Sequence, residues 1–111
     1  LGVACGAEPQ TFTGLSGLGD LVVTCISRYS RNRAVGERLA RGEELEQILT
    51  SLRMVAEGVS TTRSAYMLSQ QVGVEMPITA QMYAVLFDGK PPCQAVEELL
   101  LREAKAEYWW N

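Results

Sequence analysis

The sequence contains no histidine, and this absence excludes several kinds of catalytic site. Without an imidazole the chain cannot build a Ser-His-Asp triad, a Cys-His pair or a zinc site that requires histidine. Basic residues are also in deficit, since ten lysines and arginines stand against thirteen acidic residues. A protein that binds nucleic acid electrostatically is expected to be basic overall, so we expect no nucleic-acid partner.

Cysteines are few, and their number and spacing exclude a disulfide framework. Cys5, Cys25 and Cys93 are odd in number, far apart and never in a CxxC pair, which also argues against a zinc knuckle. We expect no metal site and interpret the three as small buried hydrophobic residues in a reducing cytosol. A catalytic cysteine is the weaker alternative, because no histidine is present to activate it.

Long apolar runs are absent as well. No run approaches the roughly 20 residues that span a bilayer, and no basic segment followed by an apolar core opens the chain. We therefore expect neither a membrane span nor a secretory signal, and a cytoplasmic location. The 111 residues suffice for one small domain that buries only about 65% of its unfolded surface. Because Leu1–Gly6 resembles the end of a longer apolar segment, we expect a piece of a longer protein, with tag removal or processing as the alternative.

Apolar residues recur at helical spacing through most of the chain. Leu45, Ile48, Leu49 and Leu52 follow an i, i+3, i+4, i+7 pattern and predict one helix. Three more helices are predicted. The first carries Ala65, Leu68 and Val72, has its N-cap at Ser60 or Thr61 and ends at Gly73. The second runs from Pro77 to near Gly89 with Met82, Val85 and Leu86 pointing inward, and the third begins at Pro91 and Pro92 and carries Val96, Leu99, Leu100 and Glu103.

The run Leu99–Leu101 is wider than a solvent-facing helix needs, so the last helix is expected to be buried on two sides. Strands are not expected, because the β-branched run Leu21–Val23 is short and has no evident pairing partner. The prediction is one all-α domain over residues 1–111, a compact bundle of four to six short helices. At its end, Trp109 and Trp110 are expected to pack on the domain's own surface rather than on a partner.

Residues 14–33 differ from the rest of the chain. Gly14, Gly17 and Gly19 form a GxxGxG pattern, which is not a dinucleotide fingerprint because no strand precedes it. The glycines favour tight helix contacts or a helix start beside a ligand. Asp20 follows among apolar residues, where a carboxylate needs a cation or hydrogen-bond donors. A plain carboxylate at a helix N-terminus is the alternative.

Ser30, Arg31 and Asn32 place a hydroxyl, a guanidinium and an amide at an expected helix start. Arginine binds phosphate through a planar fork of donors, and free N–H groups at a helix N-terminus assist it. Five arginines and a single glutamate lie between Arg28 and Arg41 of this acidic chain. A small anionic ligand and a plain N-cap with a solvated basic face remain equally open.

Residues 55–59 form a second candidate. Glu57 lies at a joint between two helices, where its carboxylate could accept hydrogen bonds from ribose hydroxyls or a carboxamide. More commonly such a glutamate favours the N-terminus of the next helix. Arg63 could serve either candidate site or the surface.

Taken together, these motifs resemble a known family. Gly14–Cys25 (GLSGLGDLVVTC), Ser30–Asn32, Val55–Gly58 (VAEG), Gly73–Ile78 (GVEMPI) and the closing Ala95–Arg102 occur in the order found in the C-terminal domain of bacterial NAD(P)-dependent glycerol-3-phosphate dehydrogenase. The resemblance covers nearly the whole chain, and the ordered set carries it rather than any single motif. Another dehydrogenase with a helical substrate domain, such as the 6-phosphogluconate type, is the alternative within the same architecture.

The resemblance implies a function and a set of roles. Enzymes of this family reduce dihydroxyacetone phosphate to sn-glycerol 3-phosphate with NADH or NADPH, and an N-terminal Rossmann domain holds most of the dinucleotide. By resemblance, Asp20, Ser30, Arg31 and Asn32 contact the glycerol phosphate, whereas Arg31, Val55 and Glu57 line the NAD or NADP side. A small-molecule substrate is thus the implied partner, and a homodimer stays open.

This sequence also departs from the family pattern. The family's general acid/base is a lysine upstream of Leu1, and Lys90 and Lys105 lie in the wrong segments to replace it. No catalytic residue is therefore assigned here, and the chain alone is expected to be inactive. A stand-alone helical module for a small phosphate and a structural or dimerisation bundle are the other hypotheses.

Overall fold

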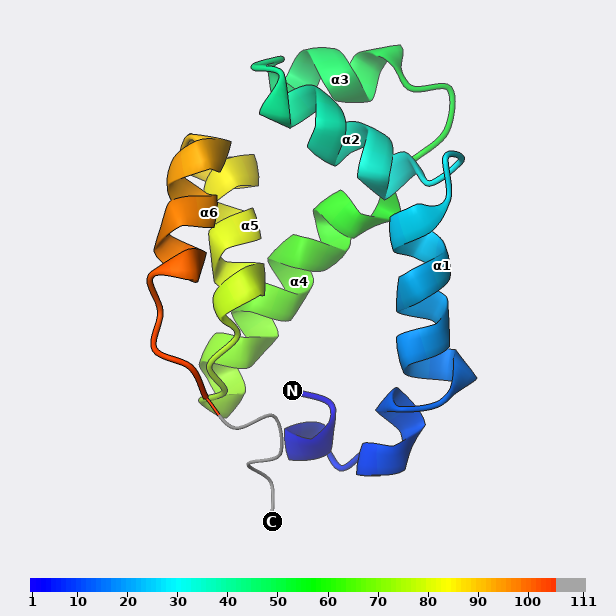
Figure 1. The fold of residues 1–111 in the computed structure, drawn as a ribbon, viewed down its shortest axis with the longest axis vertical. Coiled ribbons are helices and arrows are strands. Elements are labelled where there is room, and N and C mark those ends of the chain that lie inside the picture. Colours follow the sequence, from blue (N-terminus) through cyan, green and yellow to red (C-terminus); the bar gives the residue numbers. More distant parts are fainter. Residues whose placement is uncertain (106–111) are drawn as a thin grey trace.

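The computed structural model describes residues 1–105, which form an all-helical fold (Figure 1). Turns of 3-10 helix at Val3–Cys5 and Pro9–Phe12 and a π-helical turn at Leu15–Gly19 come first. The α-helices that follow are α1 (Asp20–Ile26), α2 (Arg31–Ala40), α3 (Leu45–Ser51), α4 (Glu57–Val72), α5 (Pro77–Phe87) and α6 (Pro92–Leu100). Residues 1–105 contain no β-strand, so the all-α prediction is confirmed and Leu21–Val23 is helical.

Most helix ends lie where the sequence predicts them. Ser30 is the N-cap of α2, and prolines occupy the first positions of α5 and α6. Gly73 ends α4 with φ +68°, a left-handed conformation that glycine adopts without steric cost. The predicted start of α4 at Ser60 or Thr61 is wrong, because this helix begins at Glu57. A side chain from α2 satisfies an amide in the added turn, and single-sequence patterns cannot show such a contact.

The hydrophobic core is small and centred on α2, α3 and the start of α4. Ile48 is completely buried and packs with Val35 and Ala56. Leu39, Leu45, Leu52 and Val59 surround this cluster and are partly buried. The predicted stripe on α3 thus faces the core, except that Leu49 remains 39% exposed.

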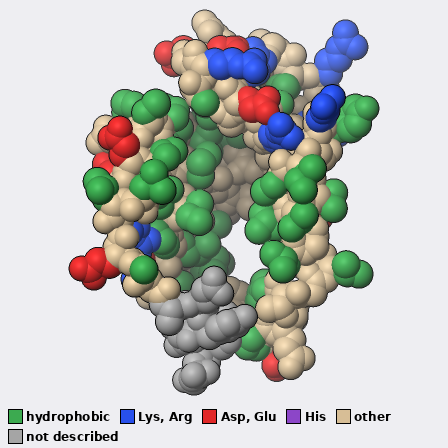
Figure 2. Space-filling model, in the orientation of Figure 1, with side chains coloured by type: hydrophobic (Ala, Val, Ile, Leu, Met, Phe, Trp, Pro, Cys, Tyr) green, Lys and Arg blue, Asp and Glu red, His purple; other side chains and the backbone are tan. Residues whose placement is uncertain are grey.

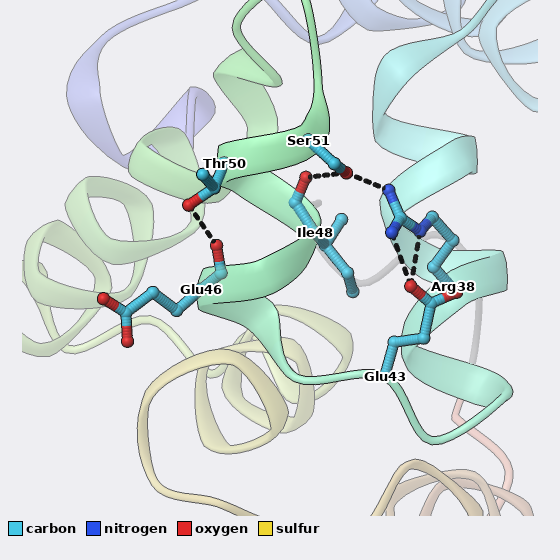
Figure 3. A network of polar contacts seen from close by, with 6 residues as sticks. All are labelled: Arg38, Glu43, Glu46, Ile48, Thr50 and Ser51. Atoms are coloured by element: carbon cyan, nitrogen blue, oxygen red, sulfur yellow. Dashed lines mark hydrogen bonds and ion pairs between the residues drawn. The ribbon is translucent and has the colours of Figure 1, made fainter.

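A polar network fastens α2 to α3 beside this core (Figure 3). Arg38 donates through Nε to Glu43 Oε2 at 2.8 Å and also donates to Ser51 Oγ. The hydroxyl of Ser51 donates in turn to the carbonyl oxygen of Ile48 at 2.9 Å. The hydrogen bond from Arg38 lowers the pKa of Glu43 and raises that of the guanidinium. The network holds the α2–α3 hairpin and so helps to fix the direction of α2.

Aromatic and polar contacts join α4, α5 and α6. Tyr66 of α4 stacks on Tyr83 of α5 with ring centroids 4.3 Å apart. Arg63 lies over the ring of Phe87, 4.3 Å from its centroid, which places it in the α4–α5 interface. Of the residues predicted to point inward from α5, Leu86 is buried and Val85 partly buried, whereas Met82 is 39% exposed.

Two predictions of burial are wrong. Cys5, Cys25 and Cys93 are all exposed, because the N-terminal turns and α1 pack against few other elements and Cys93 lies on the outer side of α6. Leu100 and Leu101 are 79% and 85% exposed, so the last helix is not buried on two sides. Among the described elements, α6 packs mainly on α5, with Ala95 as its buried residue. The predicted packing of Trp109 and Trp110 lies outside the described residues.

Candidate functional site

Five of the six predicted site residues line one open pocket of about 320 Å³. The pocket lies where the end of α1, the start of α2 and the segment before α4 meet (Figure 1). Its lining residues are Val23, Thr24, Ser27, Tyr29, Ser30, Arg31, Asn32, Val55 and Glu57. Segments more than twenty residues apart in the sequence therefore contribute to one pocket, which brings the two candidates from the sequence together.

The start of α2 presents hydrogen-bond donors to this pocket. Ser30 Oγ accepts a hydrogen bond from the backbone N–H of Arg33 at 3.2 Å, which leaves the hydroxyl proton of Ser30 to donate. Arg33 itself donates to the carbonyl oxygen of Ile26 at 2.9 Å and pairs with Glu37 at 2.9 Å. These contacts fix the turn between α1 and α2, so the positive end of the α2 dipole faces the pocket.

Arg31 supplies the cationic group of the pocket. One of its terminal nitrogens, Nη2, lies 3.1 Å from the sulfur of Met54. The guanidinium pairs with no carboxylate among residues 1–105, in contrast to Arg33 and Arg38 in the same helix. An exposed guanidinium without a counter-ion, beside a helix N-terminus, is suited to binding a phosphate.

Asn32 connects the two halves of the pocket. Its Oδ1 accepts a hydrogen bond from the backbone N–H of Gly58 at 3.0 Å, which joins the start of α2 to the start of α4. The amide nitrogen Nδ2 is then left as a donor. At the start of α4 and just before it, Glu57 is an exposed residue of the first helical turn and Val55 is 75% exposed.

Asp20 does not line this pocket. It is the first residue of α1, is exposed, and forms no hydrogen bond or ion pair through its side chain with any other described residue. It lies four residues before Thr24, which places it one helical turn below a pocket-lining residue on the same face. The positive end of the helix dipole stabilises its carboxylate at the helix N-terminus. This agrees with the alternative interpretation of Asp20 as a plain carboxylate at a helix start.

The pocket also contains residues that the sequence reasoning did not select. Thr24, Ser27 and Tyr29 contribute hydroxyl groups from the end of α1 and the following turn. Thr24 belongs to α1 and Ser27 is the residue that follows this helix, so their shared contribution depends on where the helix ends. Arg63, by contrast, lies outside the pocket over Phe87.

Comparison with known proteins identifies the family. The model of the family described as "NAD-dependent glycerol-3-phosphate dehydrogenase C-terminus" matches residues 1–97. The chain belongs to this family.

The relatives of this dehydrogenase C-terminal family are much longer than the chain. A Salinibacter ruber protein named glycerol-3-phosphate dehydrogenase [NAD(P)+] 1 is 56% identical over 109 residues, which are 98% of this chain and 32% of that protein. A glycerol-3-phosphate dehydrogenase [NAD(P)+] of Geobacter sp. strain M21 is 57% identical over 107 residues, covering 96% of this chain and 32% of its own length. The chain thus spans about a third of these relatives.

A solved structure has the same fold. The crystal structure of glycerol-3-phosphate dehydrogenase from Coxiella burnetii superposes with a TM-score of 0.87 at 39% identity. The match covers 91% of this chain and 31% of that one. The helical arrangement is therefore that of the dehydrogenase C-terminal family.

Residues 1–105 contain neither a membrane-spanning helix nor a metal-binding cluster. None of their helices has the length and apolarity needed to cross a membrane. In the same part of the chain, no group of three or more histidine, cysteine, aspartate or glutamate side chains is arranged to hold a metal ion.

Proposed function

We propose that this chain is the substrate-side helical domain of an enzyme that interconverts dihydroxyacetone phosphate and sn-glycerol 3-phosphate with NADH or NADPH. The enzyme would supply glycerol 3-phosphate for glycerophospholipid synthesis. The observation that carries this proposal is the pocket that brings Ser30, Arg31 and Asn32 together at the N-terminus of α2. Family membership supports the substrate class. The Rossmann domain and the first part of the helical domain would belong to the rest of the full-length chain.

The residues divide into two groups in this proposal. Ser30, Arg31 and Asn32 donate hydrogen bonds to the phosphate and hydroxyl oxygens of the substrate, and Asp20 accepts one from a hydroxyl or from the catalytic ammonium. Arg31 also faces the dinucleotide, together with Val55 and Glu57 across the pocket. An unpaired guanidinium, an exposed apolar side chain and an exposed carboxylate fit a phosphate, a ring face and a hydroxyl group respectively.

NADH or NADPH, when bound, supplies the hydride, and this domain supplies position. The two lysines of the chain, Lys90 and Lys105, both lie away from the pocket, which agrees with a proton donor outside this domain. Lys90 Nζ lies 2.5 Å from Glu98 on α6, and Lys105 pairs with Glu75. Both are outside the pocket, and the proposal assigns proton transfer to a residue elsewhere in the full-length enzyme.

The cellular location and the oligomeric state of the enzyme belong to the same proposal. The enzyme would act in the cytoplasm, with the small phosphorylated substrate as its main partner, and a homodimer is the oligomeric state to be tested. Subcellular fractionation and sedimentation of the full-length gene product test these two points.

A kinetic experiment tests the proposed function. The full-length gene product is expected to oxidise NADH or NADPH only when dihydroxyacetone phosphate is present. Arg31→Met should raise KM for this substrate by roughly 10- to 100-fold, because a hydrogen bond to a charged group contributes about 1.5–3 kcal/mol. Arg28→Met is the matched control, since Arg28 belongs to the same basic segment but does not line the pocket.

Two outcomes would contradict the proposal. One is the absence of dihydroxyacetone-phosphate-dependent oxidation by the full-length protein. The other is an equal change of KM in Arg31→Met and Arg28→Met. The 111-residue chain assayed alone should show no turnover.

A further inference from the structure

Gly58 approaches Asn32 so closely that no side chain fits between them. A Cβ atom built on Gly58 would lie 2.7 Å from Oδ1, 2.8 Å from Cγ and 3.0 Å from Nδ2 of Asn32. Distances below 3.0 Å require one of the two groups to move. The carboxamide is the end of a side chain, whereas Gly58 lies in the backbone of α4, so Asn32 is the group that would move.

Backbone conformation does not explain why residue 58 is glycine. The glycines with positive φ are Gly6, Gly42, Gly73 and Gly89, and Gly58 is not among them. It is the second residue of α4, where alanine would favour the helix. The close approach of Asn32 is therefore the reason in this structure for the absence of a side chain.

The contact also determines which way the carboxamide faces. The N–H of Gly58 belongs to the first turn of α4 and has no partner within its own helix. It donates to Asn32 Oδ1 at 3.0 Å, so the oxygen points to α4 and Nδ2 is the group left for the pocket. An anion requires a donor, and the opposite orientation would present an acceptor to it.

We propose that Gly58 is a positioning residue that holds the amide nitrogen of Asn32 toward the anionic substrate. This inference rests on the proposed function for the identity of the anion, but the contact itself can be tested separately. Gly58 does not line the pocket and acts through Asn32.

The test is a double-mutant cycle in the full-length enzyme, with KM for dihydroxyacetone phosphate as the readout. Asn32→Ala and Gly58→Ala are each expected to raise KM about tenfold with a much smaller change in kcat, because both remove the same hydrogen bond to a charged group. The double variant should have the KM of Asn32→Ala within about twofold, because the new methyl group then has room. Gly36→Ala is the matched control: nothing lies within 4 Å of its Cβ position on α2, and KM should not change.

Additive effects in the double variant would overturn the inference, and so would a wild-type KM in Gly58→Ala. If Gly58→Ala does not fold, the KM of Asn32→Asp tests the orientation of the Asn32 carboxamide instead. Aspartate keeps an oxygen for the Gly58 N–H but offers no donor to the anion, so its KM should exceed that of Asn32→Ala. A KM for Asn32→Asp at or below that of Asn32→Ala would show that the orientation is wrong.

Hydrogen exchange separates this inference from the proposed function. In protein labelled with ¹⁵N-glycine, the Gly58 amide should exchange several-fold faster in Asn32→Ala than in the wild type, whatever the substrate. Unchanged exchange would overturn the contact. Faster exchange without any effect of Asn32→Ala on KM would overturn the proposed substrate role and leave the contact intact.

Discussion

At the scale of single residues, the start of α2 combines a structural role with the binding role that we propose for it. Ser30 caps the helix through Oγ, and Arg31 and Asn32 follow in the first turn, where they face the pocket. The cap fixes where the helix begins and therefore where the next two side chains point. In the proposed function, the stability of α2 and substrate binding are thus coupled at Ser30.

Removal of this cap should lower stability measurably. Ser30→Ala is expected to cost about 1 kcal/mol, because the N–H of Arg33 loses its acceptor. For a domain of about 100 residues this corresponds to a decrease in Tm of roughly 4–8 °C. Thermal unfolding followed by circular dichroism measures the change. Ser64→Ala is the control, because the Ser64 hydroxyl only donates to the carbonyl of Ser60 within α4; equal losses in both variants would contradict the capping role.

At the scale of helices, α5 and α6 are joined by a hydrogen-bond network of Gln81, Lys90, Gln94 and Glu98. Lys90 Nζ lies 2.6 Å from Gln81 Oε1 and 2.5 Å from Glu98 Oε2, and Gln81 donates to the same carboxylate at 2.8 Å. Gln94 donates to its other oxygen at 3.0 Å. The hydrogen bond from Lys90, with those from Gln81 and Gln94, lowers the pKa of Glu98 to about 2.

This depressed pKa predicts a pH dependence of stability. A carboxyl group whose pKa is lower in the folded state stabilises the fold above its ordinary pKa of 4.5, and this contribution is lost as the pH falls toward 2. The difference in Tm between the wild type and Glu98→Gln should therefore be constant above about pH 5 and shrink between pH 4.5 and 2. Glu97→Gln, which changes a neighbouring residue of α6 outside this hydrogen-bond network, should show no such trend. A pH-independent difference for Glu98→Gln would contradict the prediction.

At the scale of the whole molecule, the chain exposes more surface than its mass requires. Its accessible surface is 8607 Å², whereas a compact monomer of 12.2 kDa exposes about 6,100 Å². The radius of gyration of 15.0 Å also exceeds the roughly 13 Å of a compact domain of this length. Hydrophobic side chains lie open along α1 and across α5 and α6 (Figure 2), with Leu21, Val23 and Ile26 of α1 all more than half exposed.

The open apolar surface predicts that the isolated 111-residue chain self-associates. Exposed apolar patches beyond a few hundred Å² mark interaction surfaces. Sedimentation velocity should show a rising average mass with concentration. Replacing Val23 and Ile26 with serine should reduce this effect, whereas Thr61→Ala, a control on the exposed side of α4, should not. A concentration-independent monomer would contradict the prediction.

The helical class, most helix boundaries and the importance of the residues at the start of α2 follow from the amino-acid sequence alone. Capping residues, prolines and stripes at helical spacing act within a few residues, so they can be read locally, as at Ser30, Gly73 and Pro77. The sequence also indicated the family, because ordered motifs along the chain carry that information.

Features that depend on contacts between distant segments emerge only in the folded chain. The tertiary structure placed Val55 and Glu57 beside Arg31, left Asp20 outside the pocket, and exposed the cysteines and Leu100. It also showed that α4 begins at Glu57, with the next amide bound to Asn32 of α2. The hydrogen bond to the Gly58 amide comes from a residue 26 positions away, and burial likewise depends on distant segments, so a local sequence pattern contains no record of either.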